Sequence, residues 1–81
     1  MSDETVAERV IRVIAKNKKV PPESLRPETK FEELNMDSLD ALNLIFSLEE
    51  EFDISIPNEQ AVQMKSVGQA ITGVEQLLGK G

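Results

Sequence analysis

The sequence contains no cysteine and no histidine among its 81 residues. Without cysteine the chain has neither disulfides nor thiolate zinc ligands, and zinc sites otherwise rely on histidine. A nucleophilic serine needs a base, normally histidine, and no Ser-x-x-Lys pattern begins at Ser38 to replace it. We therefore expect no metal site and no intrinsic catalysis. The lack of disulfides favours a cytoplasmic protein.

Long apolar runs are also absent. No stretch approaches the ~20 residues that a membrane-spanning helix requires, and residues 1–16 do not have the pattern of a signal peptide. The length predicts one small domain over residues 1–81, and we expect it to be a monomer. No glycine-rich phosphate loop or EF-hand spacing is present.

Basic residues are missing from the middle of the chain. The net charge is −6, and residues 31–64 contain no Lys or Arg. The acids of this segment are Glu32, Glu33, Asp37, Asp40, Glu49, Glu50, Glu51, Asp53 and Glu59. Such an acidic block argues against nucleic acid or an anionic membrane as partner. It indicates either a basic protein partner or a solvated acidic face, and mutual repulsion of the acids predicts that divalent cations affect stability.

Three segments have the apolar spacing that is typical of amphipathic helices. They cover residues 6–16, 38–51 and 67–78, and a short helical turn capped by Asn58 is expected near residues 59–63. Strand patterns are otherwise rare. We predict an all-α fold, a small bundle of three main helices plus one short helix.

Capping residues precede the main helices. Thr5 with Glu8, and Ser66 with Gln69, match the capping box, and Asp37 is a favourable N-cap. The segment 20–35 contains three of the four prolines and has no helical spacing, so we expect a long loop. Its apolar residues are expected to hold it against the helices: Val20, Leu25, Phe31 and Leu34.

The helix over residues 38–51 is apolar on two faces. The predicted core face consists of Ala41, Leu44, Ile45, Leu48 and Phe52. On the opposite side, Leu39, Leu42 and Phe46 form a second apolar strip bordered by acids. A second apolar strip is typical of a surface that docks a partner. Alternatively, the long loop covers it.

Ser38 lies in the first turn of this helix. A phosphate-linked group there would meet the positive end of the helix dipole and unpaired N–H groups. Since nothing activates Ser38 as a nucleophile, we interpret it as a modification site.

The stretch LNMDSLDALNLIFSLEEEFDISIP, residues 34–57, resembles the signature of acyl carrier proteins. Asp-Ser-Leu-Asp, Leu-Glu-Glu-Glu-Phe and Ile-x-Ile-Pro occur at the family's spacing, and the resemblance extends over essentially the whole chain. It implies a 4'-phosphopantetheine attached to Ser38 by a phosphopantetheinyl transferase that takes it from coenzyme A. The thiol of this group would carry an acyl load as a thioester for synthases and acyltransferases of fatty-acid, lipid or related biosynthesis.

The resemblance also implies two sets of site residues. Basic patches of partner enzymes would dock on Asp37, Leu39, Asp40, Leu42, Phe46, Glu49 and Glu50. An acyl chain folded into the bundle would be lined by Phe31, Leu48, Ile56, Met64, Ala70 and Val74, which ordinary core packing explains equally well.

Three positions depart from the family pattern. Asn35 replaces its glycine, Asn43 stands where fatty-acid carriers usually have an acid, and Phe46 is bulkier than the usual Met or Val. Both the general fatty-acid carrier and a specialised carrier remain open. So do an aminoacyl or peptidyl carrier, and an unmodified acidic helical interaction module.

Overall fold

Four α-helices and two short 3-10 turns form the part of the chain that the computed structural model describes, residues 5–79. The main helices are α1 (Val6–Lys18), α2 (Ser38–Phe52) and α4 (Val67–Leu77), and the short one is α3 (Asn58–Ala61). This confirms the predicted all-α bundle of three main helices and one short helix. The outermost residues of the predicted domain, 1–4 and 80–81, lie outside the described residues.

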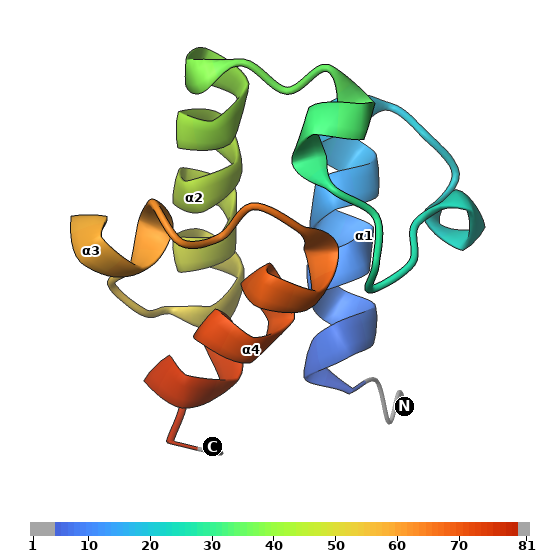
Figure 1. Cartoon of the computed structure of the whole chain (residues 1–81). Helices are drawn as coiled ribbons and strands as arrows, with labels where there is room; N and C mark the ends of the chain where they lie inside the picture. The colour runs from blue at the N-terminus through green and yellow to red at the C-terminus, as the bar shows by residue number, and fades with distance from the viewer. Residues whose placement is uncertain (1–4, 80–81) are drawn as a thin grey trace.

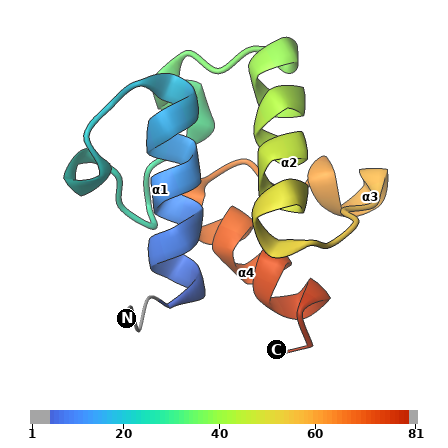
Figure 2. The ribbon, with the colours of Figure 1, turned by 180° about the vertical axis from the view of Figure 1, so that it is seen from behind.

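The helices pack around a shared interior (Figures 1 and 2). α1 and α2 run side by side in opposite directions, α4 crosses them, and α3 lies on the side of α2 away from α1. Arg9 of α1 ties the end of α2, because its guanidinium donates to the Glu51 carboxylate (3.0 Å) and carbonyl (2.9 Å). The same guanidinium lies 4.5 Å from the centroid of the Phe52 ring.

Local capping explains where the main helices begin. Thr5 and Glu8 form a complete capping box, and the Asp37 carboxylate accepts the Asp40 N–H at 2.8 Å. The predicted caps of α1 and α2 are therefore confirmed. The predicted cap of α3 is wrong: Pro57 occupies the N-cap position, and Asn58 is the first helical residue.

The connection between α1 and α2 is more ordered than a loop. It contains the 3-10 turns Pro22–Ser24 and Phe31–Leu34, which the sequence did not predict. Leu25 and Phe31 are buried, as expected. Asn35 ends the second turn with φ of 56°, a left-handed conformation that Asn tolerates better than most residues.

This connection also caps α4. The carbonyls of Thr29 and Pro27 accept the N–H groups of Val67 and Gly68, both at 2.9 Å. Helix N-termini leave their first N–H groups unpaired, so the α1–α2 connection supplies acceptors that α4 cannot supply itself.

We expect Gly68→Ala to destabilise the fold. Its Cβ would lie 2.9 Å from the Pro27 carbonyl oxygen, which is a backbone atom with little freedom to move. Glycine-to-alanine changes inside helices normally stabilise by about 0.5–1 kcal/mol, but here overpacking is expected to lower the free energy of unfolding by about 1–3 kcal/mol. Urea denaturation measures the change, with Thr72→Ala on the same helix as control. A Gly68→Ala protein at least as stable as wild type would contradict this close approach.

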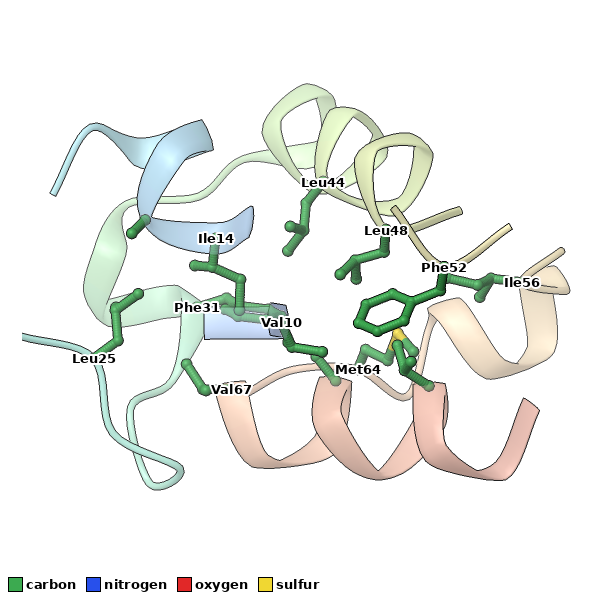
Figure 3. Close-up of a cluster of buried hydrophobic side chains, with 13 residues drawn as sticks. Val10, Ile14, Leu25, Phe31, Leu44, Leu48, Phe52, Ile56, Met64 and Val67 are labelled. Carbon is green, nitrogen blue, oxygen red and sulfur yellow. The ribbon is translucent and has the colours of Figure 1, made fainter. Parts of the chain in front are cut away.

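The hydrophobic core lies between α1, α2 and α4 (Figure 3). Leu44, Leu48 and Phe52 of α2 are buried in it, and Ile45 packs against it. Ala41 is an exception: the helical spacing predicted it for the core face, but it is exposed. It lies in the first turn of α2 and lines a surface groove together with Phe31, Met64 and Gln69.

Candidate functional site

Ser38 is the first residue of α2 and is exposed. Asp37 accepts the Asp40 N–H with its carboxylate, and its carbonyl accepts the Ala41 N–H at 2.9 Å. Within residues 5–79, the N–H groups of Ser38 and Leu39 have no hydrogen-bond partner. A phosphate on the Ser38 hydroxyl fits this end of the helix, where the dipole and unpaired N–H groups favour an anion.

A groove of about 670 Å³ opens one turn along α2 from Ser38. Ala41, at position i+3 from Ser38, lines it together with Phe31 and Met64. Lys30 and Lys65, the bases on either side of the acidic block, line it as well. The antiparallel bridge between residues 30 and 66 brings them together, and this pairing could not be read from the sequence.

The second apolar strip of α2 is open to solvent. Leu39, Leu42 and Phe46 are 65%, 51% and 54% exposed, so the α1–α2 connection does not cover them. Val62, after the end of α3, is 67% exposed and was missed by the sequence analysis. Its signal was a β-branched apolar residue, next to Ala61, within the otherwise polar stretch from Asn58 to Gln63.

Three of the four acids predicted for docking also have structural contacts. Asp37 caps α2, Asp40 binds Lys18, and Glu49 accepts the Ile56 N–H at 2.8 Å. Glu50 is exposed, and its side chain makes no hydrogen bond or ion pair with any described residue. The cap at Asp37 was predicted from the sequence. The contacts of Asp40 with Lys18 and of Glu49 with Ile56 involve residues outside α2, so spacing along α2 did not reveal how these two acids differ from Glu50.

The six residues predicted to line an acyl pocket are all buried in the core. Leu48, Ala70 and Val74 are 0% exposed, whereas Phe31 and Met64 are 8% and 7% exposed and reach the groove beside Ser38. Ile56 is also buried. The structure therefore brings the set together as core packing and places two members at the groove wall.

The carboxyl group of Asp40 is tied to α1. Lys18 donates to it at 3.0 Å, and this hydrogen bond, assisted by the charge of Lys18, holds the pKa of Asp40 below the ordinary value of 3.8. A lowered pKa means that folding favours the ionised carboxylate. The stabilisation from this pair is therefore present above the ordinary Asp pKa and is lost as the pH falls through the lowered value.

We expect Lys18→Met to raise the pKa of Asp40 because it removes the hydrogen bond and charge that lower it. Carbon-13 NMR titration of the Asp40 carboxyl group measures this change. Lys19→Met, which removes an exposed neighbouring charge, serves as control. An Asp40 pKa that Lys18→Met leaves unchanged would contradict the assignment.

Residues 5–79 contain no group of three or more carboxylates, histidines or cysteines arranged to hold a metal ion. No helix in this range is both long and apolar enough to cross a membrane.

Comparisons with known proteins agree on one family. The family profile described as "Phosphopantetheine attachment site" matches residues 8–74. The acyl carrier protein of Thermosynechococcus vestitus is 44% identical over 68 residues, which cover 83% of this chain and 84% of the relative. The mitochondrial acyl carrier protein of Dictyostelium discoideum is 38% identical over 72 residues, covering 89% of this chain and 60% of the relative.

A solved structure supports the fold. The mupirocin didomain ACP superposes with a TM-score of 0.74 over 96% of this chain and 43% of that one. Its sequence identity is 23%, so the likeness concerns the arrangement of the helices.

Proposed function

The chain belongs to the acyl carrier protein family, and from this we propose that Ser38 is the residue that carries its 4'-phosphopantetheine group. The observation that carries the proposal is the exposed hydroxyl of Ser38 at the first position of α2, next to unpaired N–H groups and a groove. Family members hold acyl groups as thioesters and deliver them to biosynthetic enzymes. The relatives named above are acyl carriers, so an aminoacyl or peptidyl carrier is not favoured.

Attachment joins the Ser38 oxygen to the β-phosphorus of coenzyme A and breaks the pyrophosphate link. Adenosine 3',5'-bisphosphate leaves, and the Ser38 proton passes to a base. The chain has no histidine, so a phosphopantetheinyl transferase supplies this base in the proposal. Once attached, the group supplies the thiol that carries the acyl load, which this cysteine-free chain lacks.

Partner enzymes dock, in this proposal, on the exposed strip that follows Ser38. Leu39, Leu42 and Phe46 offer apolar contact, and Glu50 offers a charge without a partner in the described chain. Acidic rims attract basic partner surfaces and increase association rates. The chain itself catalyses no step, acts as a monomer and shares the cytoplasm with the transferase, synthases and acyltransferases it serves.

Measurement of the intact protein mass tests directly whether Ser38 carries the group. Apo-protein incubated with coenzyme A and a broad-specificity phosphopantetheinyl transferase is expected to gain one phosphopantetheine per chain, and peptide fragmentation is expected to locate it at Ser38. Absence of the mass gain, or attachment at another residue, would overturn the proposal.

Glu50→Lys is expected to slow transfer by the transferase without loss of the fold. A reversed rim charge reduces electrostatic attraction, so we expect kcat/KM to fall by roughly 3- to 10-fold at low salt and less at high salt. Glu49 is unsuitable for this test because its side chain accepts the Ile56 N–H. Glu28→Lys makes the same charge change in the α1–α2 connection and serves as control. Equal rates for the two variants would contradict docking at Glu50.

A further inference from the structure

A second groove, of about 240 Å³, lies between α3 and α4. All four glutamines of the chain line it: Gln60, Gln63, Gln69 and Gln76. No charged residue lines it, although 30% of the chain is charged. Every glutamine thus gathers at one uncharged, polar surface, although the sequence spreads them over residues 60–76.

The amides in this groove carry unused donors and acceptors. Gln60 donates from Nε2 to Oε1 of Gln76 at 3.2 Å, which leaves the Gln60 oxygen as an acceptor and the Gln76 amide as a donor. Gln69 accepts the Lys65 N–H at 2.9 Å, so its own N–H groups are left to donate. A neutral set of this kind matches hydroxyl, carbonyl or amide groups.

The glutamine groove adjoins the groove beside Ser38. Met64 and Gln69 line both, and Ala41 in the first groove lies one turn from Ser38. Gly73 makes room at the boundary, since a Cβ there would meet the terminal methyl of Met64. The two grooves are therefore neighbours that meet at Met64 and Gln69, and a chain attached to Ser38 that enters the first groove lies next to the second.

We propose that the glutamine groove receives the hydroxyl-, carbonyl- or amide-bearing part of the chain tethered at Ser38. This inference rests on the proposed function. Its ligand chemistry has two possible sources, the amides and hydroxyl of the phosphopantetheine arm itself or an oxygenated acyl load. A plain alkyl chain does not fit, because it would cover the amides without replacing their hydrogen bonds to water.

Side-chain amide NMR signals test the proposal. Isotope-labelled protein is compared in four forms: unmodified, phosphopantetheinylated, octanoyl-loaded and 3-hydroxyoctanoyl-loaded, each verified by mass. Glutamine signals that shift on phosphopantetheinylation, and no further with either load, identify the arm as the ligand. Signals that shift only, or further, with the 3-hydroxy load identify the cargo. The Asn17 side-chain amide donates to the Val13 carbonyl within α1 and to the Ser47 hydroxyl of α2. Its NMR signal is the internal reference and is expected not to shift.

The outcomes separate this inference from the proposed function. If the protein gains no mass, the proposal of attachment at Ser38 is overturned. If the loaded protein shows unshifted glutamine signals, only the proposal of binding in the glutamine groove is overturned. Glutamine signals that are unchanged by phosphopantetheinylation but shift with the plain octanoyl load also overturn the proposal for the groove. In the double variant Gln60→Met and Gln76→Met, the response of Gln63 and Gln69 is expected to be lost, and an undiminished response contradicts the proposal. A thermal melt of this variant verifies folding.

Discussion

Ser38→Ala is expected to abolish phosphopantetheine attachment completely. The change removes the oxygen to which the phosphorus is joined, and the chain has no cysteine whose thiol could take its place. Intact mass after incubation with coenzyme A and transferase measures the loss. The fold should survive, because Asp37 rather than Ser38 caps α2, and an exposed substitution of this kind changes stability by less than ~0.5 kcal/mol.

Ser47→Ala is the matched control for this variant. Ser47 lies on the same helix, and its hydroxyl accepts from the Asn17 amide at 3.2 Å between α1 and α2. We expect Ser47→Ala to gain the same mass as wild type. Attachment to the Ser38→Ala protein at another serine or threonine would disprove the assignment of the site.

Leu48→Ala is expected to remove a large part of the stability of the fold. Its side chain is 0% exposed and packs in the core of α1, α2 and α4. Truncating a buried leucine costs about 2–5 kcal/mol through lost burial and the cavity left behind. The total free energy of unfolding of a native protein is only about 5–15 kcal/mol. Chemical denaturation followed by circular dichroism measures the loss.

Leu42→Ala makes the same chemical change on the opposite face of α2. Leu42 is 51% exposed, so its truncation is expected to change stability by less than ~0.5 kcal/mol. It should instead weaken partner binding by roughly 1–2 kcal/mol, since apolar anchors contribute much of the affinity of an interface. Isothermal titration with a partner synthase or transferase measures this effect. If Leu42→Ala destabilised the fold as strongly as Leu48→Ala, the two-face interpretation of α2 would be wrong.

Sequence alone located the elements that depend on neighbouring residues. The caps of α1 and α2 satisfy N–H groups three residues away, so Thr5 with Glu8 and Asp37 with Asp40 were readable directly. The two-faced character of α2 followed from helical periodicity, and the exposed Leu39 bears it out. The motif around Ser38 was also local and indicated the family.

Only the tertiary structure decided which residues are buried, which are exposed and which contact one another. Ala41 is exposed because it borders the open groove beside Ser38 instead of packing in the core. The Glu49 side chain accepts a backbone N–H because the chain after α2 places Ile56 beside it. The glutamine groove likewise exists only once α3 and α4 pack together. Periodicity reports which face a residue occupies, but burial and contact depend on segments distant in sequence. The sequence by itself therefore determined the helices and the candidate attachment point, and the packing of those helices decided the surfaces around it.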